Sequence, residues 1–340
     1  MRLIALAALA LLCGCAQVPV PPLPADAPRI ELAATPFFPQ RALHCGPAAL
    51  ATVLGASGVD ITADALANRL FVPARGGALQ IELLAAPREH GRLALRLDGT
   101  FEALLAQLRN GRPVLVLQNL LLERWPRWHF AVVVGYDPAT DQLILRSGGD
   151  ARLRVSRTRF LATWVRAGRW AMVVAAPGES PADFRPEQWF EAAAALESAG
   201  YAETALAAFT RAARVWPEDP VADLGRGNAL WALGRPAAAM RSWRAALVDQ
   251  PLYAPALNNL VHAHLERGEW CAAVALLPPQ EADRSGEEPA PIQSARRAIA
   301  EHAETLGQPC GPIEPSEPIE PIEPIEPIEP IEPIEPIGPT

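Results

Sequence analysis

Hydrophobic residues recur with two different periods in the first half of the chain. Apolar positions follow the spacing of an amphipathic helix over residues 45–54, 62–70, 77–89 and 100–110. From residue 113 the pattern changes to short β-rich runs between turns, at 113–118, 129–136, 142–145, 152–156 and 170–175, with one more helix at 158–167. Short strands are also expected at 29–32 and 92–97. Because most of the helices precede most of the strands, the pattern predicts an α+β domain over residues 34–177.

The second half of the chain repeats small and large apolar residues with a period of 34. The repeated positions are Gly200, Gly234 and Gly268; Ala205, Ala239 and Ala273; Phe209 and Trp243; Ala212 and Ala246; Pro217 and Pro251; and Trp189 and Leu257, with Asp223 departing from this last pair. Small residues let two helices approach closely, and glycine closes the turn between them. The pattern resembles the tetratricopeptide repeat and implies an all-α domain at 184–306, in which residues 292–306 form a capping helix.

Composition and charge limit the classes of function. The chain has 340 residues, enough for about two domains. All 30 basic residues are arginine, and the net charge of -8 comes from the glutamates of the last segment. The rest of the chain is neutral overall and has no basic stripe, which argues against a nucleic-acid partner. Residues 311–340 repeat Pro-Ile-Glu, a composition that predicts an extended, disordered tail.

The first 15 residues have the pattern of an export signal. Arg2 precedes an apolar stretch, residues 3–12, that is too short to span a bilayer. The sequence LCGC at residues 12–15 resembles the bacterial lipobox, although an ordinary cleaved signal peptide is the alternative. With Ala16 next in the chain, the resemblance implies a lipid anchor on Cys15 and an exported protein at the outer membrane, facing the periplasm. Residues 16–33 are rich in proline and predict a stiff tether.

Cys45 is the first candidate for chemistry. It is followed by Gly46 and Pro47 and then by an apolar run at helical spacing, so it is expected where a helix begins. The unpaired N–H groups and the dipole at a helix start favour a thiolate, which is the nucleophilic form of cysteine. Gln40, five residues upstream, carries an amide that is able to donate to an oxyanion. The plain alternative is a buried free cysteine at a helix start.

His129 is the candidate partner of this cysteine. It opens a strongly β-prone run, and a histidine at a strand start is able to act as the base of a thiol on a neighbouring helix. Glutamine, then cysteine at a helix start, then histidine on a later strand is the order found in papain-like cysteine peptidases. His44 also adjoins Cys45, but we expect it to point to another face.

Two segments together resemble a known family. CGPAALATVL at 45–54 with HFAVVVGYD at 129–137 is similar to the bacteriocin-processing, double-glycine-leader family of papain-like peptidases, and in particular to its stand-alone exported relatives. The resemblance spans about residues 34–177. It implies Cys45 as the nucleophile, His129 as general base and acid, and Gln40 as oxyanion-hole donor beside the Cys45 backbone N–H.

The third catalytic position departs from that family. There an acidic residue or asparagine after the next strand orients the imidazole, whereas this chain reads LRSGGD at 145–150. Ser147 falls nearest to the expected place, and Asp141 and Asp150 are the other candidates. Serine brings no charge to stabilise an imidazolium ion. This departure argues against strong proteolytic activity more than it argues against the papain-like fold.

The remaining cysteines predict a disulfide bond. Removal of Cys13 and lipidation of Cys15 would leave three cysteines in an oxidising compartment. In a stack of helical repeats, the end of the capping helix returns near the start of the third repeat's second helix. Cys310 and Cys271 fall at these two places and are predicted to pair, which leaves Cys45 as the free thiol. No cysteine or histidine spacing is typical of a zinc site, and no cofactor is implied.

These patterns predict an exported thiol hydrolase that cleaves a peptide or amide bond. A peptide or protein is the expected substrate, and the repeats offer a surface for a protein partner. Two alternatives stay open. One is a non-catalytic periplasmic scaffold or binding lipoprotein with a degenerate peptidase domain, and the other is an acyltransferase or transamidase that uses the same thiol.

Overall fold

The computed structural model describes residues 28–40, 44–72, 77–278 and 288–306. The signal segment with Cys15, most of the proline-rich segment, Cys310 and the Pro-Ile-Glu tail lie outside the described residues. The chain divides into two compact units, residues 1–233 and 234–340, and each is described by itself. No helix in the described part of the chain is long and apolar enough to cross a membrane.

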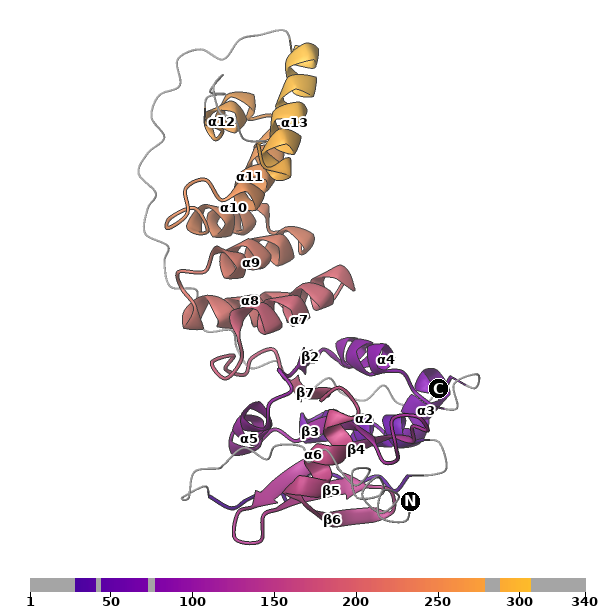
Figure 1. Cartoon of the computed structure of the whole chain (residues 1–340). Coiled ribbons are helices and arrows are strands. Elements are labelled where there is room, and N and C mark those ends of the chain that lie inside the picture. The colour runs from indigo at the N-terminus through magenta and orange to yellow at the C-terminus, as the bar shows by residue number, and fades with distance from the viewer. Residues whose placement is uncertain (1–27, 41–43, 73–76, 279–287, 307–340) are drawn as a thin grey trace, which may run out of the picture. The chain divides into compact units, whose positions relative to one another are not determined.

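An antiparallel seven-stranded sheet forms the centre of the first unit (Figure 1). Its order is β2-β7-β3-β4-β5-β6, and β1 pairs with the end of β4. The strands are β1 (Ile30–Glu31), β2 (Leu93–Arg96), β3 (Val114–Asn119), β4 (Trp128–Asp137), β5 (Gln142–Ser147), β6 (Asp150–Ser156) and β7 (Ala171–Ala175). This confirms the α+β expectation, and each expected β-rich run overlaps one of these strands.

Helices cover both faces of the sheet. The main core joins α2 (Cys45–Ala56), α3 (Ala63–Leu70) and α4 (Gln80–Ala85) to one face, through buried residues such as Leu50, Leu117 and Val132. On the other face, Phe101 of α5 (Phe101–Arg109) packs edge-on against Tyr136, and Thr163 of α6 (Arg157–Val165) accepts a 2.6 Å hydrogen bond from Gln118 of β3. The central strands β3 and β4 therefore have one face toward each layer of helices.

Three of these helices begin directly after a residue with a hydroxyl side chain. Thr62, Thr100 and Ser156 each accept a hydrogen bond from a backbone N–H in the first turn of the helix that follows. The expected helix at 77–89 is wrong in extent, because the α-helix ends at Ala85 and a 3-10 helix, η2 (Ala86–His90), follows. Pro87 lacks the N–H that would continue the α-helical hydrogen bonds.

Three further helices complete the first unit: α7 (Pro186–Ser198), α8 (Ala202–Val215) and α9 (Pro220–Ala232). Trp189 of α7 donates from its indole to the Ala208 carbonyl of α8 at 3.0 Å. The Phe209 ring lies so close to Gly225 of α9 that a Cβ there would be 2.4 Å from it, so only glycine fits. Asp223, which breaks the repeat pattern, pairs with Arg226 at 2.6 Å, one turn further along α9.

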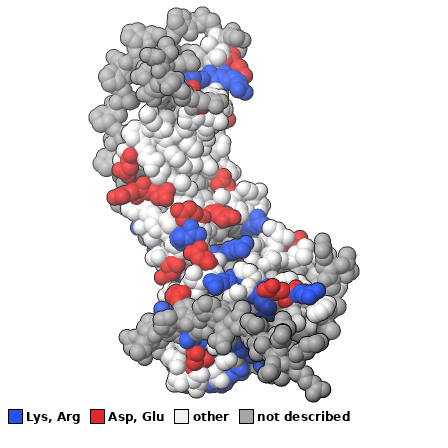
Figure 2. Space-filling model, in the orientation of Figure 1, with Lys and Arg blue, Asp and Glu red and all other residues white. Residues whose placement is uncertain are grey.

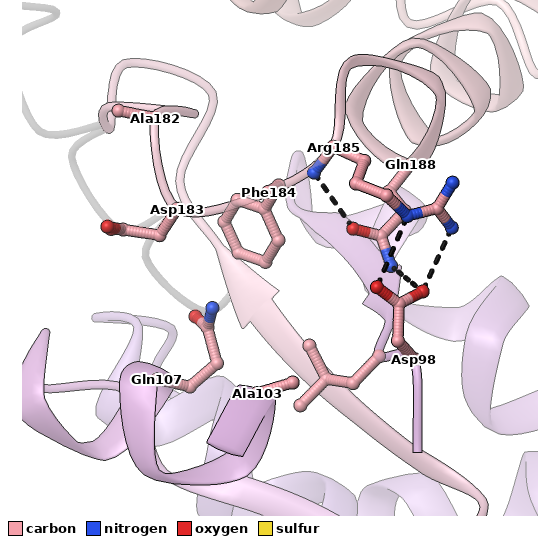
Figure 3. Close-up of a pocket in the computed structure, with 9 residues that line it drawn as sticks. Asp98, Ala103, Gln107, Ala182, Asp183, Phe184, Arg185 and Gln188 are labelled. Atoms are coloured by element: carbon pink, nitrogen blue, oxygen red, sulfur yellow. Dashed lines mark hydrogen bonds and ion pairs between the residues drawn. The ribbon is translucent and has the colours of Figure 1, made fainter. Parts of the chain in front are cut away.

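The start of α7 is tied to the sheet domain (Figure 3). Asp98, just after β2, accepts hydrogen bonds from Arg185 at 2.9 Å and from Gln188 at 3.1 Å. Phe184 lies beside these residues in a pocket that Gln107 of α5 also lines. Arg112 adds ion pairs to Glu179 and Asp183 in the segment between β7 and α7.

The second unit is helical as well. It contains α10 (Pro236–Ala245), α11 (Ala254–Glu266), α12 (Trp270–Ala275) and α13 (Ala290–Leu306), with Val261, Ala273 and Ala295 in its core. Gly200, Gly234 and Gly268 all have positive φ angles, between 70° and 84°, at the turns where the 34-residue period places them. The predicted helices and the glycine turns between them are therefore present, while their assignment to the tetratricopeptide repeat stays a prediction.

Candidate active site

Cys45 is the first residue of α2. Its side chain is half-buried, and its thiol is free. The helix has no side-chain N-cap and no acidic residue in its first turn. No carboxylate of that turn therefore competes with the Cys45 sulfur for the positive end of the helix dipole. The expected helix start is confirmed, and it presents backbone N–H groups beside the sulfur.

Gly46 fixes where this helix start lies. A Cβ at this position would be 2.6 Å from the Cβ of Ala78 and 3.5 Å from the ring of Phe130. The backbone of α2 is thus pressed between the segment before α4 and the first residues of β4. Cys45 and His129 are the chain neighbours of Gly46 and Phe130, so this contact places both residues at the same end of the sheet.

His129 is bound to Ser147. Its Nε2 lies 2.8 Å from the Ser147 hydroxyl oxygen, which is buried at the end of β5. The pairing of β4 with β5 brings these two residues together although they are 18 positions apart. With Nε2 engaged by Ser147, Nδ1 is the ring nitrogen left for a thiol, and within the described residues no hydrogen bond joins Cys45 to the ring.

The surroundings of His129 favour its neutral form. Burial of the ring lowers the pKa of His129 below the ordinary value of a histidine, and the positive charge of Arg127 lowers it further. Ser147 supplies a hydrogen-bond partner but no negative charge that would oppose these effects. The ring is therefore suited to accept a proton as a base at neutral pH.

Gln40 lies next to the same strand. Its backbone N–H donates to the Gly148 carbonyl at 3.0 Å, and its side-chain amide donates to the Phe130 carbonyl at 3.3 Å. Arg146 of β5 holds the segment that precedes Gln40, because its guanidinium donates to the carbonyls of Ala33 and Thr35 at 3.1 Å each. The amide of Gln40 is thus held beside His129, although its N–H is engaged by the backbone.

The competing candidates lie in other environments. Asp141 accepts a 2.7 Å hydrogen bond from the Tyr136 hydroxyl and pairs with Arg157, and Asp150 is exposed at the start of β6. The His44 ring packs edge-on against Phe71 with centroids 5.5 Å apart. Of the three candidates for the third position, Ser147 is the one whose hydrogen bond to His129 the structure contains.

A feature that sequence reasoning did not interpret lies directly before His129. The loop of residues 120–127 and Trp128 expose several large apolar side chains to solvent. The run LLLERWPRW at 120–128 was the available signal, but a run of this kind is equally typical of a buried strand.

The other predicted sites have different outcomes. Cys271 is disulfide-bonded, but Cys310 lies outside the described residues, so their pairing stays a prediction. Cys15 lies outside the described residues too, and its lipidation remains an expectation. Within the described residues, no group of three histidine, cysteine or carboxylate side chains is arranged to hold a metal ion.

The first domain is similar to a known family of proteins. Residues 33–172 match the Peptidase_C39 like family. Among solved structures, the chain resembles a putative C39-like peptidase from Bacillus anthracis, with 21% identity, a TM-score of 0.39, and coverage of 44% of this chain and 98% of the other. It also resembles the peptidase domain of Streptococcus ComA, a bi-functional ABC transporter involved in a quorum-sensing pathway, with 21% identity, a TM-score of 0.33, and coverage of 40% and 95%. No curated protein matches the chain.

Proposed function

We propose that residues 34–177 form a papain-like thiol hydrolase that cleaves a peptide or amide bond. The observation that carries this proposal is the 2.8 Å contact between His129 and Ser147, beside a helix whose first residue is the free cysteine Cys45. The match of residues 33–172 to the Peptidase_C39 like family supports a cysteine peptidase type of function.

The reaction begins with transfer of the Cys45 proton to Nδ1 of His129. The thiolate attacks the substrate carbonyl carbon, and the carbonyl electrons move to the oxygen as the C–S bond forms. The intermediate collapses with cleavage of the C–N bond, and the imidazolium gives its proton to the departing amine. A water molecule, deprotonated by His129, then hydrolyses the thioester and restores the thiol.

Two neighbouring groups have positioning and electrostatic roles in this scheme. Ser147 accepts from the Nε2–H of His129, which fixes the tautomer whose Nδ1 is free to act as the base. Gln40 and the Cys45 backbone N–H stabilise the oxyanion, which requires the Gln40 amide to exchange its 3.3 Å bond with the Phe130 carbonyl for one with substrate. Substrate binding therefore completes the oxyanion hole.

The remaining parts of the chain have roles outside the chemistry. The helical pairs of residues 184–306 act as tetratricopeptide repeats and bind a protein partner. The protein is exported and anchored through a lipid on Cys15 to the outer membrane, facing the periplasm. The lipobox-like residues 12–15 and the proline-rich segment that follows support this placement.

A non-catalytic binding protein is the second candidate, and two observations favour it. The third position carries the uncharged Ser147, and the Gln40 amide is already bonded to a backbone carbonyl. In this case the helical repeats would carry the function. An acyltransferase or transamidase is chemically close to the hydrolase, because an amine would then resolve the thioester in place of water.

Alkylation of Cys45 separates these candidates. The chain from Ala16 onward is treated with a limiting amount of iodoacetamide at pH 6 to 8, and wild type is compared with Cys45→Ala and His129→Ala. A working pair predicts labelling confined to Cys45, faster than a free thiol and slowed at least tenfold in His129→Ala. Labelling at the rate of a free thiol and indifferent to His129 would contradict the hydrolase and leave the binding protein.

Where labelling is fast, a peptide library analysed by mass spectrometry follows. Free peptide fragments identify hydrolysis, and products joined to an added amine identify transamidation. Cys45→Ala is the control that must abolish both kinds of product.

A further inference from the structure

The loop between β3 and β4 carries a concentrated apolar surface. Five large hydrophobic side chains within nine residues are exposed, with exposed fractions of 39%, 51%, 63%, 67% and 55% for Leu120, Leu121, Leu122, Trp125 and Trp128. These side chains are called the apolar tip below. Single exposed hydrophobic residues are ordinary on protein surfaces, but a contiguous group on one loop is typical of an interaction site.

The apolar tip is held in a defined conformation. Asn119, itself buried, accepts from the backbone N–H groups of Leu121 and Arg127 at 3.1 and 3.0 Å, and it donates to the Leu122 carbonyl at 3.3 Å. The backbone adds bonds from Leu120 to Arg127 at 2.9 Å and from Trp125 to Leu122 at 3.2 Å. The loop therefore presents its apolar side chains from a braced hairpin, so little conformational entropy is lost when they bind.

The other side chains of this loop narrow the choice of partner. Arg124 lies over the Trp125 ring, with its guanidinium 5.6 Å from the ring centroid, and Arg127 is exposed two residues further on. Glu123 is the acidic residue of the segment 120–128, so this segment carries a net positive charge. Elsewhere, in the face drawn in Figure 2, arginine and acidic side chains are interspersed. Tryptophan and arginine around leucines are the combination that favours the boundary between lipid headgroups and acyl chains.

The chain before β1 is long enough for a lipid-anchored protein to place the Trp128 end of the sheet at a bilayer. Ile30 pairs with Tyr136 of β4, eight residues from Trp128, which corresponds to about 27 Å along the strand. The 14 residues between Cys15 and Ile30 span about 43 Å when extended as polyproline II. The segment is therefore long enough for a lipid on Cys15 to reach the level of the apolar tip.

We propose that the apolar tip docks on a bilayer with anionic phospholipid headgroups, where the leucines and tryptophans enter the interface and Arg124 and Arg127 pair with phosphates. His129 follows Trp128 directly, so docking holds the candidate active site at the membrane surface. The contact is a second attachment beside the proposed lipid anchor and does not depend on the peptidase function. A short linkage between two attachments raises the effective concentration of the second.

The test measures vesicle binding by the chain from Ala16 onward, which carries no lipid. Vesicles of phosphatidylethanolamine and phosphatidylglycerol are compared with pure phosphatidylcholine, by co-sedimentation and by quenching of tryptophan fluorescence with brominated lipid. The altered protein is Leu121→Ser/Leu122→Ser/Trp125→Ser. The matched control is Val248→Ser/Leu252→Ser, which removes side chains of similar exposure, 67% and 62%, from the second unit.

Docking predicts that wild type binds the anionic vesicles, that the triple variant loses at least tenfold in affinity, and that the control is unchanged. Arg124→Gln/Arg127→Gln should weaken binding to anionic vesicles while leaving binding to phosphatidylcholine unaltered. Cys45→Ala should bind as wild type, which separates this result from failure of the proposed hydrolase. Circular dichroism and thermal unfolding verify that each variant folds.

The proposal is wrong if wild-type protein does not sediment with anionic vesicles, or if the triple variant binds them as well as wild type does. If neither protein binds vesicles but the triple variant loses affinity for a peptide substrate, the apolar tip is assigned to substrate recognition instead.

Discussion

The basicity of His129 depends on its burial, on the nearby Arg127 and on the absence of a carboxylate at the Ser147 position. Burial and Arg127 both lower its pKa, whereas Ser147 offers a neutral oxygen to Nε2. A carboxylate at this place would favour the imidazolium form. The site is therefore suited to a neutral imidazole at rest, which takes up a proton when the thiol attacks.

Substitution of Ser147 tests this balance. Ser147→Asp should raise the pKa of His129, because a negative charge would face Nε2, and the titration of the ring followed by NMR should move to higher pH. In the wild type the ring should titrate at lower pH than an ordinary histidine, since its protonated form is disfavoured by burial. Ser147→Ala removes the 2.8 Å contact without adding charge and should slow Cys45 alkylation about three- to tenfold. An unchanged titration in Ser147→Asp would show that the two side chains do not meet in solution.

At the level of elements, the start of α2 depends on one close approach. Gly46 allows the backbone of the helix to lie against Ala78, in the segment that leads to α4. Helix α2 is buried along most of its length, and Leu50 and Leu54 are fully buried. A shift of the helix start would therefore have to move Cys45 relative to β4.

Gly46→Ala should destabilise the fold by about 1–3 kcal/mol in urea unfolding, because its Cβ would come within 2.6 Å of the Cβ of Ala78. The double variant Gly46→Ala/Ala78→Gly removes the clash and should recover most of this loss. Gly149→Ala is the control, since nothing lies within 4 Å of its added Cβ. A double variant no more stable than the single one would show that Ala78 is not the source of the strain.

At the scale of the whole molecule, the sheet domain is fastened to the helices that follow it by Arg112. Its buried guanidinium donates to Glu179 at 2.8 Å, to Asp183 at 3.3 Å and to the Ser180 carbonyl at 3.3 Å, and it stacks on Phe184 at 5.2 Å. These contacts gather the segment between β7 and α7 around one side chain.

Arg112→Ala should lower the free energy of unfolding by about 2 kcal/mol, because two carboxylates and a carbonyl lose a buried partner. Hydrogen exchange should accelerate over residues 176–185, while the strands keep their protection. Arg109→Ala, at an exposed arginine three residues earlier, is the matched control and should change little. Equal effects of the two substitutions would exclude a special role for Arg112.

The cysteines give a second prediction at this scale. The chain from Ala16 onward has three cysteines, and we expect one titratable thiol in the native oxidised protein, assigned to Cys45, and three after reduction and unfolding. The free thiol of Cys45 and the bonded state of Cys271 support this expectation. Three native thiols after export into an oxidising compartment would contradict it.

The sequence alone determined the local features, because these depend on contacts a few residues apart. Thr62 and Thr100 mark helix starts through their own hydroxyl groups, and Gly200, Gly234 and Gly268 mark turns through the positive φ that glycine tolerates. The place of Cys45 at a helix start follows from Gly46, Pro47 and the apolar run behind them. The alternation of apolar residues also predicts the strands, while the apolar pattern at 77–89 predicts too long a helix, because Pro87 interrupts the α-helical hydrogen bonds.

Only the tertiary structure decided which residues meet across the sheet. Ser147 was one of three candidates until the pairing of β4 with β5 brought its hydroxyl to His129, since a strand's register determines its cross-strand neighbours. The lowered pKa of His129, the contact of the Gln40 amide with Phe130 and the exposure of Trp125 and Trp128 likewise depend on burial by distant segments. Burial and long-range contacts arise from the packed chain, and a linear pattern of residue types does not contain them.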